Sequence, residues 1–404
     1  MALMPVEEAL ALLLSTAAPL GAETVPLDAA AGRVLAAPVV AGRTTPGADV
    51  SAMDGYAVRA DDVTHVPVTL EILGESAAGR PFSGPVRPGT AVRIFTGAVL
   101  PEGADAIVIQ EDTVRDGNSA TLTEAATPGR HIRRAGGDFA SGETLLPAGH
   151  RLRARDLALV AAGDVAKVSV VRRPRVALLS TGDELMRPGE GAEAHQVIVS
   201  NIYSVAALAR SAGAEVADLG ILRDTMAATR AGVRAALDGG FDVLVTTGGA
   251  SVGDHDLIAP ALTAEGIALA VHKIALRPGK PLMFGRGAQT QVLGLPGNPV
   301  SAHVCALLFL VPLIKALQGL PVPAHPALEP ARLASDVSAN EQRMDFQRAE
   351  IVGDAEGLPL VRALPVQDSS MLRQLARADA LLVRRPHAPA AKAGEMCEIL
   401  RLED

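Results

Sequence analysis

Hydrophobic and polar positions along the chain form three successive patterns, and the first is helical. Residues 5–17 read as a helix, with Pro5 in the first turn, two early glutamates, and Pro19 and Gly21 as stop signals. A second, shorter helix is expected over residues 29–35. The segment after it, AGRTTPGADVSAMDGYAVRADD, is dense in small and polar residues and reads as irregular.

The second pattern runs from about residue 66 to residue 134 and indicates β structure. Short alternating runs such as VPVTLEIL, TAVRIFTG, DAIVIQED and SATLTEA are separated by Gly, Pro and Asp-Gly. This spacing of short strands and turns is typical of an all-β domain. The stretch LPAGHRLRARDLALVAAG then predicts a turn and a helix, with Asp156 near the beginning of the helix.

The third pattern covers residues 175–320, where short apolar strands alternate with helices. Strands are expected in RVALLS, EVADLGIL, DVLVTT, KIAL, PLMFG and QVLGL, and helices in NIYSVAALARSAG, in DTMAATRAGVRAALDG and from Pro299 to Leu317. Such alternation favours a parallel, doubly wound α/β sheet. Beyond Pro323, short strands with Pro and Gly breaks predict a small C-terminal β domain.

Composition and charge narrow the classes of function. The net charge of -8 argues against a broad nucleic-acid surface, although a local positive pocket can still bind an anionic small molecule. Two distant cysteines, with Cys305 expected in the core, indicate a reducing compartment. We expect a soluble cytoplasmic protein, because the first residues show no secretory leader and the apolar run 304–314 is too short to span a membrane.

Three loops at the carboxyl ends of the expected strands carry the candidate chemistry, because ligands of open parallel sheets bind there. The first follows Ser180 and Thr181 and contains Asp183 and Glu184. These acids suit either a hard cation or a capped turn, and the residues alone favour the turn. The P-loop and dinucleotide-binding patterns are both absent from the sequence, which disfavours the common nucleotide-driven classes.

The second loop, TTGGASVGDHD, offers backbone N–H groups with few bulky side chains. Its small residues include Gly248, Gly249, Ser251 and Gly253, a composition that favours an oxyanion cradle. Asp254 and Asp256 follow, and Mg²⁺ prefers one or two carboxylates together with phosphate and water. We therefore expect this loop to bind phosphate next to a divalent cation.

The third region combines ALRPGKPLMFG with GLPGNPVSAH. Arg277 and Lys280 flank a Pro-Gly turn and can neutralise an anion. The second stretch ends a strand and begins a helix, whose free N–H groups form another anion site. The residues that we assign to this binding edge are Pro296, Gly297, Asn298 and Ser301.

Six sequence blocks together resemble one family. They are SAMDGYAVR (51–59), RIFTGAVLPEGADAIVIQED (93–112), STGDEL (180–185), TTGGASVGDHD (246–256), RPGKP (277–281) and GLPGNPVS (294–301). They are similar to the MoeA-type molybdopterin molybdenumtransferases, the family that includes the E domain of gephyrin and its plant counterpart. The blocks stand in the family order, and the resemblance extends from about residue 5 to residue 400.

The resemblance implies an elongated homodimer of four-domain subunits. Residues 1–45 and 137–172 correspond to an extended domain made of two segments, and residues 46–136 to a β domain inserted in it. Residues 173–322 correspond to the molybdopterin-binding α/β domain, and residues 323–404 to a β-barrel-like domain. The family converts adenylylated molybdopterin into molybdenum cofactor with molybdate and Mg²⁺, and releases AMP.

The resemblance also implies roles for individual residues. The expected catalytic residues are Asp54, Thr96, Asp138, Glu184 and Asp256, and the expected Mg²⁺ ligands are Glu184, Asp224 and Asp256. The residues expected to bind molybdate are Arg277, Lys280, Pro281, Arg348 and Ser369. The family often has Lys where Arg277 stands, so a planar guanidinium replaces a point charge here.

Two alternatives stay open at this point. One is a molybdopterin adenylyltransferase, which acts one step earlier and shares the α/β domain; the SAMDGYAV block and the extra domains argue against it. The other is a non-catalytic pterin-binding scaffold, against which the full set of acids argues. The expected partners are adenylylated molybdopterin, molybdate, a second copy of the chain, the molybdopterin adenylyltransferase and the recipient molybdoenzymes.

Overall fold

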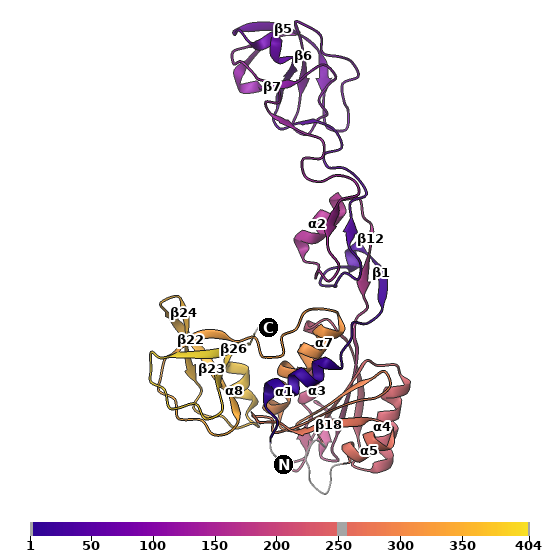
Figure 1. The fold of residues 1–404 in the computed structure, drawn as a ribbon, viewed down its shortest axis with the longest axis vertical. Coiled ribbons are helices and arrows are strands. Elements are labelled where there is room, and N and C mark those ends of the chain that lie inside the picture. Colours follow the sequence, from indigo (N-terminus) through magenta and orange to yellow (C-terminus); the bar gives the residue numbers. More distant parts are fainter. Residues whose placement is uncertain (1–2, 249–256, 403–404) are drawn as a thin grey trace. The chain divides into compact units, whose positions relative to one another are not determined.

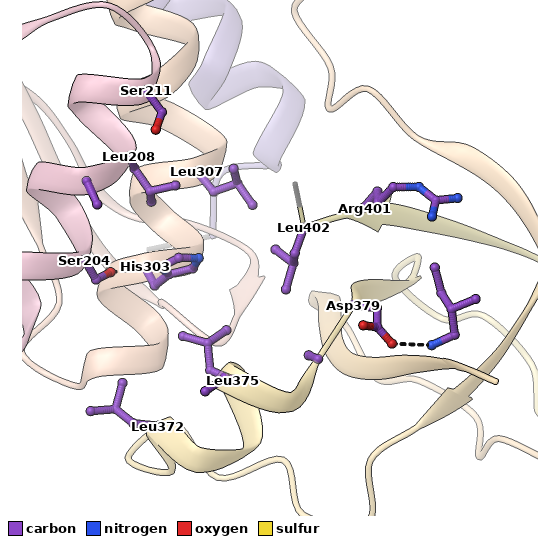
Figure 2. A pocket seen from close by; sticks show the side chains of 14 residues that line it. Ser204, Leu208, Ser211, His303, Leu307, Leu372, Leu375, Asp379, Arg401 and Leu402 are labelled. Carbon is purple, nitrogen blue, oxygen red and sulfur yellow. Dashed lines mark hydrogen bonds between the residues drawn. The ribbon is translucent and has the colours of Figure 1, made fainter. Parts of the chain in front are cut away.

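The computed structural model describes residues 3–248 and 257–402, and the chain divides into two compact units (Figure 1). Unit 1 comprises Met1–Glu23 and Val171–Asp404, and unit 2 comprises Thr24–Val170. Unit 2 therefore interrupts unit 1 in the sequence. Each unit has apolar clusters of its own.

Unit 2 is mainly β structure, as the short alternating runs predict. Its helices are η1 (Leu27–Ala29), η2 (Ala60–Val63), η3 (Gln110–Asp112) and α2 (Ala154–Ala162). Its strands, with β1 that leads into it, are β1 (Ala22–Pro26), β2 (Val39–Val40), β3 (Val50–Ser51), β4 (Gly55–Val58), β5 (Val68–Ser76), β6 (Thr90–Ile94), β7 (Ala106–Ile109), β8 (Thr113–Asp116), β9 (Ser119–Leu122), β10 (Ile132–Arg133), β11 (Thr144–Leu146) and β12 (Lys167–Val171). Six of them form one sheet in the order β7-β4-β6-β5-β9-β8.

Strand β4 lies inside this sheet and explains one of the sequence blocks. It pairs antiparallel with both β6 and β7, and the consecutive residues Tyr56 and Ala57 enter separate apolar clusters. At Gly55, a Cβ atom would lie 2.1 Å from the carbonyl oxygen of Val108. The close approach of two backbones therefore requires glycine at this position.

The remainder of unit 2 confirms one predicted helix and corrects another. Helix α2 begins with a capping box, in which the Asp156 carboxylate accepts the Arg153 N–H at 2.8 Å. The helix expected over residues 29–35 is wrong. Only a 3₁₀ turn forms before it, and Gly32 adopts a left-handed φ of 73°, which ends any helical run.

Unit 1 contains the predicted alternation of strands and helices, followed by the C-terminal strands. Its helices are α1 (Val6–Ser15), α3 (Asn201–Ser211), α4 (Met226–Asp238), α5 (Ile258–Ala264), α6 (Pro299–Cys305), the π turn η4 (Ala306–Leu310), α7 (Val311–Leu317) and α8 (Leu372–Arg377). Its strands are β13 (Arg175–Thr181), β14 (Leu185–Met186), β15 (Val197–Ile198), β16 (Glu215–Leu222), β17 (Val243–Thr247), β18 (Ala268–Lys273), β19 (Leu276–Arg277), β20 (Pro281–Arg286), β21 (Gln291–Leu295), β22 (Glu329–Leu333), β23 (Met344–Ala355), β24 (Leu358–Ala363), β25 (Ala380–Arg384) and β26 (Met396–Arg401).

The α/β sheet has the order β16-β13-β17-β21-β20-β18. The first four strands are parallel, as predicted, and helices cover both faces: α1, α3 and α6 pack in one apolar cluster, and α4 and α5 in another. The expectation of a fully parallel sheet is wrong at one edge, because β20 and β18 are antiparallel. The expected strand KIAL is also wrong, since residues 274–275 separate β18 from β19.

The predicted helix from Pro299 to Leu317 is confirmed and forms the centre of the larger core. Helices α6, η4 and α7 follow one another without a break, and Cys305 and Phe309 are fully buried. By length and composition this helix could cross a membrane, with a mean hydropathy of 2.1, but 67% of that window is buried within the protein. Burial against the sheet explains its apolar composition.

The C-terminal strands close into a five-stranded barrel, in agreement with the predicted β-barrel-like domain. Strands β23, β24, β22, β26 and β25 pair in that order, and β25 returns to β23. Strand β19 from the α/β part adds to the barrel alongside β23. Met344 and Phe346 of the barrel share the apolar cluster of α6 and α1, so the barrel and the α/β sheet have a common core.

We predict that Gly55→Ala disrupts the sheet of unit 2. The new Cβ would overlap the Val108 carbonyl oxygen, and β4 has to separate from β7 at a cost of about 3 kcal/mol. Hydrogen exchange of the β4 amides measures this loss of protection. Gly47→Ala is the matched control, because its Cβ would be 3.6 Å from the nearest atom. Equal protection in both variants would contradict the packing argument.

Candidate functional site

A cleft of about 490 Å³ opens at the carboxyl edge of the α/β sheet, next to the barrel. The loops after β13, β17 and β21 form one side, and residues that precede and begin α8 form another. The lining residues are Thr181, Glu184, Leu185, Val197, Ile198, Val199, Ser200, Asn201, Thr247, Gly248, Gly297, Asn298, Pro299, Ser370 and Leu372. The cleft thus brings together residues from all three predicted loops and from the C-terminal domain.

The floor of the cleft depends on two parallel strands that end side by side. Thr181 and Gly248 line the cleft, whereas Ser180 is fully buried and its hydroxyl lies 2.8 Å from that of Thr247. Gly248 has a φ of 88°, and a Cβ atom there would lie 2.7 Å from the carbonyl oxygen of Thr181. Glycine therefore allows the loop after β17 to leave the sheet close to the loop after β13.

The turn before α6 is fastened on two sides. The Asn201 side chain of α3 donates to the Gly297 carbonyl at 2.8 Å. The Asn298 side chain donates to the Ser369 hydroxyl at 2.8 Å, and the Val300 N–H donates to the Ser369 carbonyl at 3.0 Å. The start of α6 is therefore joined directly to the barrel. Of the other residues assigned to this edge by sequence, Pro296 and Ser301 are buried beside it.

Acidic side chains gather where β13 and β16 end. Glu184 and Asp224 are exposed, and the loops that hold them are coupled, since Asp183 and Asp224 each accept the other's backbone N–H at 3.2 and 3.4 Å. Five predicted residues lie outside the described residues: Gly249, Ser251, Gly253, Asp254 and Asp256. Within residues 3–248 and 257–402, no three acidic, His or Cys side chains form a metal-binding group.

The predicted anion-binding residues lie at the junction with the barrel. Arg277 is 39% exposed and pairs with Asp345 at 2.5 Å, and this hydrogen bond raises the pKa of the guanidinium. Arg348 is 1% exposed, and burial lowers its pKa. Lys280 is exposed, and its ammonium forms no ion pair in the described part of the chain.

The Arg348 guanidinium is only partly satisfied. One of its terminal nitrogens donates to the Asp368 carbonyl at 3.2 Å, next to Ser369, while its Nε atom is buried and finds no partner among the described residues. A buried donor without a hydrogen-bond partner lowers the stability of the fold.

Pro281, the remaining predicted member of the anion-binding group, begins β20.

Unit 2 contains the other predicted catalytic residues. The Asp54 carboxylate accepts the Thr96 N–H at 2.7 Å and the Thr96 hydroxyl at 2.8 Å, and these bonds lower the pKa of Asp54. The two sequence blocks that contain them therefore meet in space. Asp138 is exposed, and its N–H donates to the Thr45 carbonyl at 3.1 Å.

Sequence reasoning missed several residues that organise the site. Asn201 holds the turn before α6, and its position at the start of a helix after the apolar run VIVS was a usable signal. Asp345 and Asn340 both contact Arg277 from more than sixty positions away in the sequence. Asp345 lies in the block MDFQR beside the predicted Arg348, but its partner could not be read from spacing.

Three family models match successive parts of the chain. The MoeA N-terminal region (domain I and II) matches residues 4–163, a probable molybdopterin binding domain matches residues 177–316, and the MoeA C-terminal region (domain IV) matches residues 330–402. Together these models extend over most of the sequence.

Named relatives agree with the family models. The chain is 35% identical to a molybdopterin molybdenumtransferase of Haemophilus influenzae over 94% of each chain. It is 39% identical to molybdopterin molybdenumtransferase 2 of Mycobacterium tuberculosis, over 89% of this chain and 90% of that one. A solved structure of the molybdopterin biosynthesis MoeA protein from Pyrococcus horikoshii matches with a TM-score of 0.85 and 30% identity over 100% of both chains.

We predict that Thr96→Val raises the pKa of Asp54 part of the way toward 3.8. The variant removes the hydroxyl donor but keeps the backbone N–H, which is the larger cause of the low pKa. Carbon NMR of the Asp54 carboxyl measures the titration midpoint. Thr69→Val, which affects an exposed hydroxyl pair in the same sheet, is the control and leaves the midpoint unchanged.

The lowered pKa of Asp54 determines how the stability of the fold changes with pH. Because the folded pKa lies below the unfolded value, the bonds to Asp54 contribute their full stability above about pH 4, and lose it as pH falls through the folded pKa. A midpoint in Thr96→Val equal to that of the unchanged protein would show that the hydroxyl does not contribute.

Proposed function

The chain belongs to the MoeA family of molybdopterin molybdenumtransferases, and on that premise we propose that its substrate is adenylylated molybdopterin and that Mg²⁺ assists the release of AMP. Molybdate is the second substrate. The product is molybdenum cofactor.

The observation that carries this proposal is the buried guanidinium of Arg348, whose Nε atom finds no partner among the described residues. A buried cation with an open donor is stabilised by an anion that accepts a hydrogen bond from it. Lys280 belongs to the turn between β19 and β20, and β19 pairs with the β23 strand that contains Arg348. A tetrahedral dianion such as molybdate matches these charges, with the Ser369 hydroxyl as a further donor.

The adjoining cleft supports a phosphorylated pterin. Gly248 and the Gly297–Asn298 turn present backbone at the carboxyl edge of the sheet, where anionic ligands of parallel sheets bind. Val197, Ile198 and Leu372 also line the cleft and supply exposed apolar surface. Apolar walls with a few convergent polar groups are typical of a small-molecule site. We infer that the cleft holds the pterin and its phosphates.

The acids at this edge are suitable for Mg²⁺. Glu184 lines the cleft, and Asp224 follows the neighbouring strand; both are exposed carboxylates. Mg²⁺ commonly uses one or two protein carboxylates and completes its shell with water and phosphate oxygens. When bound, the ion neutralises charge that develops on the phosphoanhydride. We assign Glu184 and Asp224 to hold it, together with Asp256.

The residues of the chain then have separable tasks. Cleavage of the phosphoanhydride consumes one water equivalent and gives AMP and the terminal phosphate of the pterin. The cleft orients the phosphates, and Lys280 and Arg348 hold molybdate. The two pterin sulfurs bind molybdenum, and their two protons leave with one molybdate oxygen as a molecule of water. The homodimer and the exchange with an adenylyltransferase and with recipient molybdoenzymes belong to the same proposal and are inferred from family membership. The cytoplasmic location, also part of the proposal, is inferred from the cysteine usage.

We predict that the purified protein releases AMP from adenylylated molybdopterin only when Mg²⁺ and molybdate are both present. AMP is measured by chromatography, and cofactor by reconstitution of a molybdenum-free apoenzyme. Pterin binding without AMP release would contradict the proposal and favour a carrier or scaffold. Consumption of ATP with AMP-pterin formation would instead favour the adenylyltransferase.

We predict that Lys280→Met raises the KM for molybdate by about 10- to 100-fold, because the variant loses one charge-assisted hydrogen bond to the anion. The variant should fold normally, because the ammonium is exposed and forms no ion pair in the described part of the chain. Lys315→Met, on α7, is the control and leaves the KM unchanged. An unchanged KM in Lys280→Met would remove this residue from the molybdate site.

We predict that Glu184→Gln lowers the rate of AMP release by about 100-fold at low Mg²⁺, since a metal at a developing phosphate charge contributes several kcal/mol. Raising the Mg²⁺ concentration should restore part of the rate. Glu190→Gln, which removes an exposed carboxylate in a nearby turn, is the control. A loss that does not depend on the Mg²⁺ concentration would contradict a role in metal binding.

A further inference from the structure

Arg277 faces a carboxylate in this protein, and its charge is therefore already matched. Its guanidinium donates to Asp345 at 2.5 Å and to the Asn340 side-chain oxygen at 3.2 Å. Asp345 is 5% exposed, so the pair is partly withdrawn from water on the acidic side. An ion pair of this kind presents little net positive charge to a third group.

Asn340 is held rigidly for this contact. Its side-chain amide nitrogen lies 2.7 to 2.8 Å from the carbonyl oxygens of Arg343, Arg384 and Arg385, which share its two hydrogens. These bonds fix the orientation of the amide, and its oxygen is left to accept the Arg277 guanidinium. The Asp345 carboxylate also accepts from Gln347 at 2.9 Å. The acceptors for Arg277 are thus preorganised by the barrel.

The contact between Arg277 and Asp345 holds in place the turn between β19 and β20, which contains Lys280. Arg277 and Leu276 form β19, which pairs with Asp345 and Met344 of β23. Lys280 follows within three residues, after Gly279, where a Cβ atom would lie 2.5 Å from the Cys305 sulfur of α6. The turn is therefore held between the barrel and α6, and the Lys280 ammonium remains free within the described part of the chain.

We propose that Asp345, supported by Asn340, is a positioning residue that takes Arg277 out of direct contact with the anion and uses it to fix the Lys280 turn. The charge that meets molybdate then comes from Lys280 and Arg348. This inference rests on the proposed molybdate site and specifies it. One terminal nitrogen of the Arg277 guanidinium donates to both acceptors, the Asp345 carboxylate and the Asn340 side-chain oxygen.

The test is a double-mutant cycle on molybdate affinity, measured by calorimetry on the full chain. Arg277→Met and Asp345→Asn should each weaken binding about 10-fold, and the double variant should also be about 10-fold weaker, since both remove the same contact. Arg277→Lys should be intermediate. Losses that multiply to about 100-fold would show that Arg277 contacts the anion independently, and would overturn the proposal.

The dependence of molybdate affinity on ionic strength distinguishes a residue that positions the turn from a residue whose charge acts directly on the anion. Lys280→Met should reduce the dependence of affinity on ionic strength, whereas the double variant Arg277→Met with Asp345→Asn should leave it unchanged, because it removes the ion pair without changing the local net charge. The same change of slope in both variants would overturn the proposal. Arg401→Met, which breaks an exposed ion pair with Glu329 on the same barrel, is the matched control and should affect neither affinity nor slope.

Activity provides the second readout. Arg277→Met should raise the KM for molybdate in AMP release while kcat changes by less than about threefold, and thermal unfolding should confirm that the variants are folded. If the unmodified protein binds molybdate but releases no AMP, the proposed function fails, and the binding cycle still decides the role of Asp345. If it binds no molybdate, both proposals are overturned.

Discussion

The arrangement of unit 1 depends on a short parallel pairing between β19 and β23. Leu276 lies opposite Met344 and Arg277 opposite Asp345, so the chain that leaves the α/β sheet becomes an additional strand beside the barrel. Met344 and Phe346 then enter the same apolar core as α6. Separation of the barrel from the sheet would expose this core. The cleft between them is consequently defined by buried apolar surface and by hydrogen bonds, of which the Asn298–Ser369 contact is the most direct.

The pairing of β19 with β23 also explains how cationic and acidic side chains lie in the same region without forming ion pairs with one another. The acids Glu184 and Asp224 follow β13 and β16, whereas the cations Lys280 and Arg348 belong to the side formed by the barrel and the turn before β20. Phosphate requires both, since a metal and a positive side chain act on different oxygens. The ion pair of Arg277 with Asp345 reduces the net charge on the cationic side, and the exposed Lys280 ammonium forms no ion pair with the residues that the structure describes.

The sequence patterns predicted much of the fold because local periodicity determines it. The parallel strands, the long apolar helix and the α2 cap were all readable from spacing and from turn residues. The antiparallel edge was not predicted, although PLMFG and QVLGL are separated by only a few residues, which is the spacing of a hairpin and too short for a crossover. Most site residues were named through family resemblance. Asp345 and Asn340 were missed because their contacts with Arg277 join residues more than sixty positions apart, which meet where β19 pairs with β23.

The central claim is that molybdate binds at the junction between the α/β sheet and the barrel. The most direct measurement is anomalous X-ray diffraction at the molybdenum absorption edge from crystals of the protein soaked with molybdate. The account predicts one strong peak within hydrogen-bond distance of Lys280, Arg348 and Ser369, which disappears in Lys280→Met. A peak confined to another cationic surface, such as the Arg230 and Arg234 pair on α4, would contradict it.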